Sequence, residues 1–198
     1  MAARSGWTPL DLLRAYLDAG ATFIQVRAKH LESGAFLTLC DAAVAAARPF
    51  GAQIVVNDRV DLACMAGAAG VHVGQDDVPP VHARALLGSD AILGVSTHSV
   101  VQIDRAVREP VSYIAVGPVF GTGSKDTGYE AVGLDLVREA ARRAGHVPVV
   151  AIGGVTDARV PEIAEAGAAG IAAISLFRDA ESAARVVATA RRAFDTPC

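Results

Sequence analysis

The sequence lacks a long apolar run, an excess of positive charge and an abundance of aromatic residues. No apolar stretch approaches the roughly 18 to 20 residues that a helix needs to cross a bilayer. The formal net charge is −3 and only 5% of the 198 residues are aromatic, so the chain offers neither a positive field nor stacking platforms for nucleic acid. We therefore expect neither a membrane nor a nucleic acid among its partners.

Cysteine is scarce as well. The three cysteines, Cys40, Cys64 and Cys198, are widely spaced and predict neither a disulfide framework nor a zinc site. The residues before Thr8 contain no apolar core for a signal peptide. These features predict a cytoplasmic protein. Because 52% of the residues are hydrophobic, the chain can bury a sizeable core, and its length suits a single domain over residues 1–198.

Apolar runs of strand length recur along the chain and are rich in β-branched residues. They are nearly continuous rather than alternating, which is typical of parallel strands buried on both faces. The expected strands cover residues 23–26, 54–56, 71–73, 92–95, 113–116, 147–152 and 171–174. Segments with helical periodicity separate them, and the first begins at Thr8-Pro9, a hydroxyl cap followed by proline. The other helices are expected at about 33–48, 60–66, 78–87, 99–108, 132–144, 157–166 and 180–194.

A short signature, Ala-Gly-Ala, joins helix to strand three times, at Gly20, Gly67 and Gly167. Glycine there supplies the left-handed residue that ends a helix. Strict alternation of seven strands with eight helices favours a TIM-type (β/α)8 barrel over an open doubly wound sheet, which would carry Gly-x-Gly-x-x-Gly after its first strand. Since the chain opens directly into a helix, the first barrel strand is expected to be missing or degenerate. Either residues 1–7 replace it poorly, or the natural chain starts further upstream.

Polar residues follow the first expected strand. Alternation along an extended chain places Gln25, Arg27 and Lys29 on one face. In such a barrel the active site lies where the strands end, and a guanidinium beside an ammonium group suits a polyanionic substrate. A solvated strand end with no function is an equally open interpretation of this spacing alone.

Acidic residues follow the second and third expected strands, at Asp58 and at Asp76-Asp77. Carboxylates brought together raise each other's pKa unless a cation lies between them, and Mg²⁺ takes one or two carboxylates with phosphate oxygens as its other ligands. Helix capping is the alternative. Asp58 could cap the helix after it, and one of Asp76 and Asp77 could cap the helix that opens near Pro79-Pro80.

Hydroxyl groups follow the fourth expected strand, at Ser96 and Thr97. They can donate to phosphate oxygens, although Thr97 or Ser99 could instead cap the next helix. His98 is a candidate acid or base, but a lone histidine near a helix start is more often structural. No acidic residue stands in a recognisable relay with Ser96 and His98, which excludes a hydrolase triad.

Glycine-bearing loops follow two later strands. The loop over residues 117–125 carries two hydroxyls and a lysine and can wrap an anion with its backbone N–H groups, although it lacks the Walker spacing. Gly153-Gly154 lets a phosphate approach bare backbone, and the alternative is a tight turn into a helix near Asp157. If one strand is missing at the front, this turn follows barrel strand seven, where phosphate sites are common. The sequence thus offers two candidate anion sites and a carboxylate pair, and it shows no obvious nucleophile. This combination favours a Mg²⁺-assisted reaction with an anionic leaving group.

Together these residues resemble the thiamine phosphate synthase family, from about Thr8 to Phe194. The motifs that carry the resemblance are Gln25-x-Arg27-x-Lys29, Asn57-Asp58-Arg59, Gly70-Val-His-Val-Gly-Gln-Asp-Asp77, Gly94-Val-Ser-Thr-His98, Gly117-Pro-Val-Phe120, Thr122-x-Ser-Lys125 and Ile152-Gly-Gly154. The resemblance implies joining 4-amino-2-methyl-5-pyrimidinylmethyl diphosphate to 4-methyl-5-(2-phosphoethyl)thiazole, with release of pyrophosphate. It also implies a dissociative path through a pyrimidine-methyl cation, which the thiazole nitrogen captures.

The resemblance also assigns roles to individual residues. Asp58 and Asp77 are expected to bind Mg²⁺, and Gln25 to lie beside the pyrimidine ring. The groups expected to hold the diphosphate are Arg27, Lys29, Asn57 and Lys125, with Ser96 nearby. Of these, the expected catalytic residues are Arg27, Lys29, Ser96 and Lys125. The groups expected to receive the thiazole phosphate are Thr122, Ser124, Gly154, Ile174 and Ser175.

The sequence departs from the family's pattern in two places. The usual opening strand is absent, and the later loop has Gly121 where proline is common and Ser124 where threonine is common. One rival function is that of the thiazole tautomerase branch, which tends to lose the carboxylates that Asp58 and Asp77 supply here. The other rival is a non-catalytic barrel that binds phosphate ligands. The sequence predicts small phosphate and diphosphate substrates as partners, and it leaves the oligomeric state open.

Overall fold

The computed structural model describes residues 7–121, 129–174, 176 and 180–194, and strands alternate with helices throughout this part of the chain. Its strands are β1 Phe23–Val26, β2 Gln53–Asn57, β3 Gly70–Val73, β4 Ile92–Thr97, β5 Tyr113–Val116, β6 Val149–Ile152 and β7 Gly170–Ala172. Its α-helices are α1 Pro9–Asp18, α2 Ser33–Ala47, α3 Val60–Met65, α4 Pro80–Leu87, α5 Val100–Ala106, α6 Gly133–Ala144, α7 Val160–Glu165 and α8 Ala180–Phe194. Two short 3-10 helices, η1 Arg48–Phe50 and η2 Asp157–Arg159, lead out of α2 and into α7.

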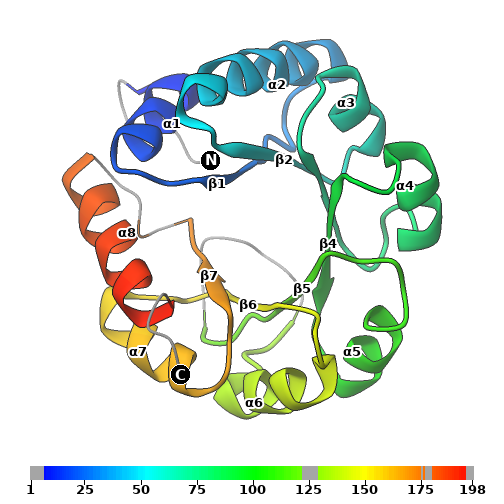
Figure 1. The fold of residues 1–198 in the computed structure, drawn as a ribbon, viewed down its shortest axis with the longest axis vertical. Helices are drawn as coiled ribbons and strands as arrows, with labels where there is room; N and C mark the ends of the chain where they lie inside the picture. The colour runs from blue at the N-terminus through cyan, green and yellow to red at the C-terminus, as the bar shows by residue number, and fades with distance from the viewer. Residues whose placement is uncertain (1–6, 122–128, 175, 177–179, 195–198) are drawn as a thin grey trace.

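The seven strands form one parallel sheet in chain order, β1 to β7, and the sheet curls with its helices on the outside (Figure 1). This arrangement confirms the expected barrel architecture. Outward-facing residues such as Ile54 and Val56 are buried beneath the helices, and they alternate with inward-facing residues such as Val55 and Asn57. The interior side chains therefore come from alternate positions of each strand.

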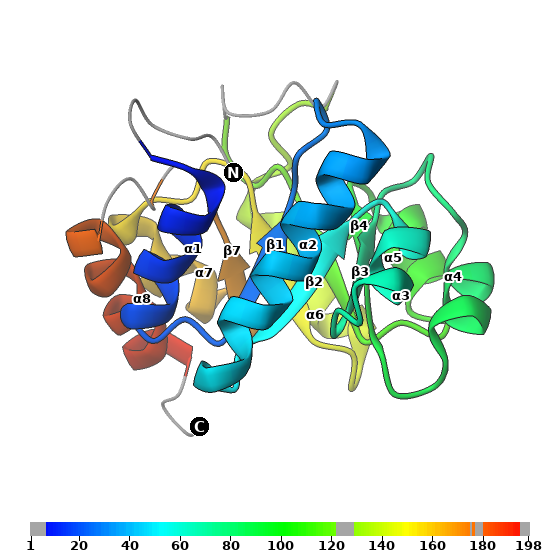
Figure 2. The ribbon, with the colours of Figure 1, turned by 90° about the horizontal axis from the view of Figure 1, so that it is seen from above.

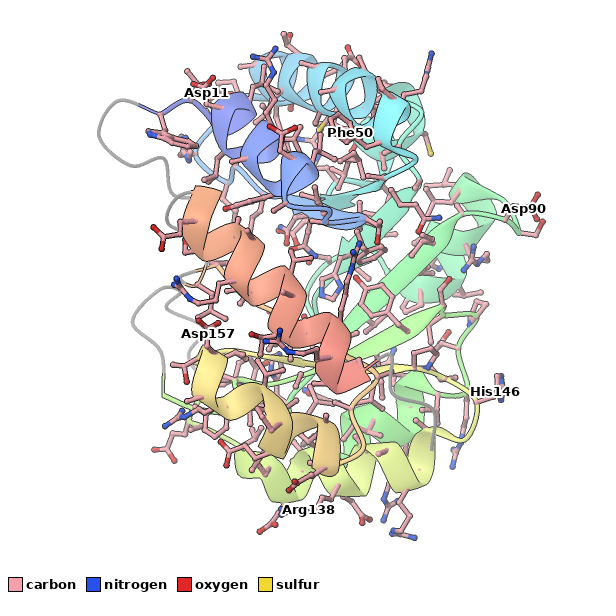
Figure 3. The ribbon with its side chains drawn as sticks, turned by 60° about the vertical axis from the view of Figure 1, so that its left-hand side comes forward. Asp11, Phe50, Asp90, Arg138, His146 and Asp157 are labelled. Carbon is pink, nitrogen blue, oxygen red and sulfur yellow. The ribbon has the colours of Figure 1, made fainter. Side chains whose placement is uncertain are left out.

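An open seam separates β1 from β7. Within the described residues each of these strands pairs with one neighbour, and no eighth strand joins them (Figure 1). Helices α1 and α8 lie side by side along this seam (Figures 2 and 3). Phe23 at the start of β1 is 45% exposed, and Ile174 just beyond β7 is 41% exposed. The expected lack of a first barrel strand thus agrees with the described structure.

The helix ends follow the sequence signals closely. Thr8 accepts a hydrogen bond from the Asp11 backbone and the Asp11 side chain accepts one from the Thr8 backbone, which completes a capping box before α1. Gly20, Gly67 and Gly167 have φ angles of 86°, 60° and 89°, so all three predicted helix-ending glycines are left-handed. None of the described helices is long and apolar enough to cross a membrane.

The predicted strand boundaries near the end of the chain are wrong by one or two residues. The strand expected from residue 147 begins at Val149, because the Val147 N–H closes a turn on the Ala144 carbonyl. The last strand ends at Ala172, two residues before the expected end, so Ile174 lies in the segment that follows β7.

Candidate active site

The carboxyl ends of the parallel strands meet at one edge of the curled sheet (Figure 2). The predicted polar residues that the structure describes lie near these strand ends along the chain. Gln25 and Arg27 alternate with Val26 and Ala28, which are buried under the helices, so the polar pair faces the barrel interior and is half-buried there. This pattern agrees with the predicted shared face for Gln25 and Arg27, whereas β1 ends at Val26 and Lys29 lies in the exposed segment after it. Lys29, two residues further along, reaches across to the loop after β2.

Lys29 and Asp58 form an ion pair at this edge, with 2.8 Å between Nζ and Oδ2. Asp58 also has a φ of 63°, and it is the one described residue other than glycine in the left-handed region. Such a conformation strains the backbone and is typical of functional turns. Asp58 does not cap α3, whose cap position is Arg59 with no side-chain cap bond, so that alternative is wrong.

Asp77 lies beside Asp58, and the Gly74 N–H donates to its Oδ2 at 2.7 Å. Burial and the neighbouring Asp58 raise the pKa of Asp77, while the Gly74 N–H and the Lys29 charge lower it. Asp77 caps the turn at Gly74 rather than α4, because the cap position of α4 is Pro79 and makes no side-chain bond. Helix capping by Asp76 or Asp77 is thus a wrong prediction.

The two carboxylates are chemically suited to a divalent cation. Asp58 and Asp77 supply hard oxygen donors, and the pKa of Asp77 is raised first by its burial and then by the neighbouring Asp58 carboxylate. Within the described ranges, no group of three or more His, Cys, Asp or Glu side chains could enclose a metal. A cation held here would therefore take further oxygens from a ligand or from water, as Mg²⁺ does.

Three buried polar side chains line the interior below this edge: Asn57, His72 and Ser96, each 7% exposed or less. His72 Nε2 lies 2.8 Å from Ser96 Oγ, and His72 Nδ1 lies 2.8 Å from the Tyr113 hydroxyl. Sequence reasoning assigned no role to His72 or Tyr113. The signal for His72 was a single polar residue within the apolar strand Gly70–Val73.

The Gly153-Gly154 turn after β6 has φ angles of 86° and 65°. A Cβ atom at Gly154 would lie 2.7 Å from Phe120 Cβ and 2.8 Å from the Gly121 carbonyl oxygen, so a side chain cannot be accommodated. Arg159, which the sequence analysis missed, stacks over the Phe120 ring at 3.8 Å and donates to the Gly154 carbonyl at 3.3 Å. A guanidinium group thus adjoins the predicted phosphate turn.

His98 has a structural environment. Its Nδ1 contacts the Gly117 carbonyl oxygen, its backbone N–H donates to Gln102 Oε1 at 2.6 Å, and its ring stacks on Tyr129 with centroids 3.7 Å apart. Ser99 caps α5 by accepting from the Gln102 N–H, as one of the sequence alternatives predicted. These contacts favour the structural interpretation of His98.

Several predicted site residues fall outside the part of the chain that the structure describes. They are Thr122, Ser124, Lys125 and Ser175. Their assignments stay predictions, as do the ligand roles of Gln25, Arg27 and Asn57. Ile174, which is described, is exposed at the end of the seam rather than enclosed.

A curled parallel sheet with charged groups at its carboxyl edge defines the α/β-barrel class of fold, whose enzymes have their active sites at that edge. Within that class the chain belongs to the thiamine monophosphate synthase family, whose model matches residues 3–177. Enzymes of this family are transferases, so the prediction of a transferase is confirmed.

Individual relatives agree with this assignment. The chain is 43% identical over 177 residues to the thiamine-phosphate synthase of Acidothermus cellulolyticus, covering 89% of this chain and 83% of the relative. It is 41% identical over 181 residues to the thiamine-phosphate synthase of Roseiflexus castenholzii, covering 90% and 79%. The solved structure of thiamine phosphate pyrophosphorylase from Pyrococcus furiosus superposes with a TM-score of 0.87 at 27% identity, covering 96% of this chain and 93% of that one.

Proposed function

We propose that the chain condenses 4-amino-2-methyl-5-pyrimidinylmethyl diphosphate with 4-methyl-5-(2-phosphoethyl)thiazole to give thiamine phosphate and pyrophosphate, with Mg²⁺ as cofactor. The observation that carries the proposal is the cluster of Lys29, Asp58 and Asp77 at the carboxyl edge of the sheet. Such a cluster suits a diphosphate that arrives with a divalent cation, because an ammonium group and two carboxylates can hold the anion and the cation together.

Asp58 and Asp77 are the residues that would hold Mg²⁺. When bound there, the ion would neutralise negative charge on the diphosphate. Lys29 pairs with Asp58 in the described structure and would contact the same diphosphate. Together with Arg27, it would stabilise the negative charge that grows on the leaving oxygen.

The bond changes of this reaction balance without an external base or oxidant. The bond between the methylene carbon and the diphosphate oxygen breaks first, and its electron pair leaves with pyrophosphate. The thiazole nitrogen then donates its lone pair to the pyrimidine-methyl cation and forms the new C–N bond. This path explains why the site needs no nucleophilic side chain and depends on positioning and charge neutralisation.

The remaining assignments follow the same logic. Gln25 would face the pyrimidine ring, Asn57 and Ser96 would contact the diphosphate, and Lys125 would add a further positive charge. The left-handed turn at Gly153-Gly154, which packs closely against Phe120 and Gly121, would offer backbone N–H groups to the thiazole phosphate. The other groups proposed for that phosphate are Thr122, Ser124, Ile174 and Ser175.

Two rival functions are separable by experiment. A tautomerase would move a proton on the thiazole phosphate alone, so solvent hydrogen would exchange into that substrate without the diphosphate or Mg²⁺. A non-catalytic binding barrel, which the open seam between β1 and β7 would favour, would bind the phosphates without turnover. We place the reaction in the cytoplasm, with small phosphate and diphosphate compounds as its substrates.

The metal site is tested by assaying Asp58→Ala for thiamine phosphate formation across a Mg²⁺ titration. We expect activity at saturating substrates to fall by about a hundredfold, because one of two cation ligands is lost. Asp76→Ala is the matched control, since Asp76 is exposed, adjacent to Asp77 and outside the cluster. Equal losses of activity in the two variants, or no loss in Asp58→Ala, would contradict the assignment of Asp58 as a metal ligand.

A further inference from the structure

A chain of three buried side chains crosses the interior from β5 to β4. The Tyr113 hydroxyl lies 2.8 Å from His72 Nδ1, and His72 Nε2 lies 2.8 Å from Ser96 Oγ. Tyr113 and His72 both pair in register with Gly94, whereas Ser96 lies two residues further toward the carboxyl edge. The hydrogen-bonded series Tyr113–His72–Ser96 therefore leads from the middle of the sheet to the edge that carries Lys29 and Asp58.

Gly94 makes this chain sterically feasible. Tyr113 is on β5 and His72 is on β3, so the Tyr113 ring must pass over the intervening strand β4. A Cβ atom at Gly94 would lie 2.1 Å from the Tyr113 ring and 2.4 Å from its hydroxyl oxygen. Phe23 packs edge-on against the ring from β1, with centroids 5.8 Å apart. Because position 94 has no side chain, the Tyr113 ring can lie over β4. The contact from Phe23 then helps to hold the Tyr113 hydroxyl at His72.

The direction of the hydrogen bonds follows from the burial of Tyr113. This residue is 9% exposed, and among the described residues its hydroxyl has no hydrogen-bond partner other than His72 Nδ1. If His72 carried its proton on Nδ1, the tyrosine O–H would be buried without an acceptor, which is unfavourable. Tyr113 therefore donates to Nδ1, and His72 donates from Nε2 to Ser96 Oγ. Ser96 then has its own hydroxyl hydrogen left to donate.

We propose that Tyr113 is a positioning residue that fixes the tautomer of His72 and thereby commits the Ser96 hydroxyl to donate to the departing anion at the strand ends. The identity of that anion as a diphosphate rests on the proposed function. Donors aligned in one direction polarise one another, so the bond from Ser96 strengthens as negative charge develops on the leaving oxygen. Tyr113 and His72 thus act on the reaction through Ser96 without touching the substrate.

The direct test is a double-mutant cycle of Tyr113→Phe and Ser96→Ala, read as kcat and KM with saturating Mg²⁺. We expect Tyr113→Phe to lower kcat by about tenfold, the usual effect of one hydrogen bond to a charged group, with a smaller change in KM. In the Ser96→Ala background the same substitution should have almost no effect. Tyr16→Phe, which removes a buried tyrosine hydroxyl on α1, is the matched control and should leave kcat unchanged.

A second readout does not depend on turnover. Nitrogen NMR of histidine-labelled protein should show His72 protonated at Nε2 alone in the unmodified chain, and a mixture of tautomers in Tyr113→Phe. A proton on Nδ1 in the unmodified chain, or additive losses in the double-mutant cycle, would overturn the proposal.

If the unmodified chain forms no thiamine phosphate, the proposed function fails. The same double-mutant cycle is then measured as the affinity for inorganic pyrophosphate with Mg²⁺. Additive losses of affinity in the two variants would overturn the positioning role of Tyr113, whatever the outcome for the proposed function.

Discussion

At the scale of single residues, Asp58 combines a proposed role as a cation ligand with a strained backbone. Its φ of 63° lies in a region that side chains with a Cβ atom rarely adopt, and its carboxylate holds Lys29 at 2.8 Å beside Asp77. The sequence predicted the identity of both carboxylates and their place at neighbouring strand ends. It could not predict the left-handed backbone or the pairing with Lys29, because both depend on how the loops after β1 and β2 meet.

The strain at Asp58 predicts that two substitutions there differ in stability but not in activity. Asp58→Gly should be more stable than Asp58→Ala by about 1 kcal/mol, because glycine adopts a positive φ without a steric cost. Both variants should lose Mg²⁺-dependent activity alike. Urea unfolding midpoints measure the difference in stability. At Asp76, whose φ is not positive, the order should reverse, and the same order at both positions would contradict the assignment of strain.

At the scale of the elements, α1 depends on its N-terminal cap. Thr8 Oγ1 accepts from the Asp11 N–H at 3.2 Å, and Asp11 Oδ2 accepts from the Thr8 N–H at 2.9 Å. These hydrogen bonds also lower the pKa of Asp11. Since α1 lies against α8 along the open seam, its order affects both sides of that seam. The sequence predicted this cap because the Thr-Pro start is a purely local signal.

Thr8→Ala should lower the free energy of unfolding by about 1 kcal/mol, the usual cost of losing a threonine cap. Thr38→Ala is the matched control. Thr38 lies inside α2, where its hydroxyl bonds back to the Gly34 carbonyl, and alanine is the better helix former at such a position. We expect the control to unfold at the same or a slightly higher urea concentration. A loss of stability in Thr38→Ala as large as that in Thr8→Ala would contradict a specific role for the cap.

Helix α6 carries a charge network that ties it to α5. Glu139 accepts from Arg142 Nη2 at 2.6 Å and also contacts Arg143, and Arg143 Nη1 reaches both carboxylate oxygens of Asp104 on α5 at 2.8 Å. Hydrogen bonds from Arg142 and Arg143 lower the pKa of Glu139 from 4.5 to about 2. A lowered pKa means that the folded state favours the ionised form. The stabilisation is complete above the ordinary pKa and disappears as the pH falls through about 2.

Glu139→Gln should therefore reduce the urea midpoint at neutral pH, and its difference from the unmodified chain should shrink as the pH falls below 4.5. Asp135→Asn is the control on the same helix, since Asp135 forms an exposed ion pair with Arg138, which lies on the outer side of α6 (Figure 3). It should have little effect at any pH. A difference for Glu139→Gln that stays constant with pH would show that the network does not stabilise the fold through its charge.

At the scale of the whole molecule, the described sheet has two ends, β1 and β7. Strand β4 has a hydrogen-bonded neighbour on each side, whereas β7 pairs with β6 alone and is half-exposed. Hydrogen exchange measured by mass spectrometry should therefore show faster exchange of the β7 amides than of the β4 amides under native conditions. Equal protection of the two strands would mean that a further segment covers the β7 edge.

Sequence reasoning predicted the alternation of elements well, because parallel strands buried on both faces leave continuous apolar runs such as Tyr113–Val116. It predicted the polar strand ends for the same reason. It could not find the chain of Tyr113, His72 and Ser96, because these residues lie on three different strands and meet only when the sheet curls. Arg159 was missed because its contact with Phe120 joins η2 to the segment after β5, and the two lie far apart in the sequence.

The most direct test of the central claim is to mix the purified chain with the pyrimidine diphosphate and the thiazole phosphate, with and without Mg²⁺, and to quantify thiamine phosphate by fluorescence after oxidation. We predict that one pyrophosphate is released for each thiamine phosphate formed, and that both products are lost when Mg²⁺ is chelated and restored when it is added back. Product formation that does not depend on Mg²⁺, or a folded chain that binds both substrates and forms no product, would contradict the proposed function.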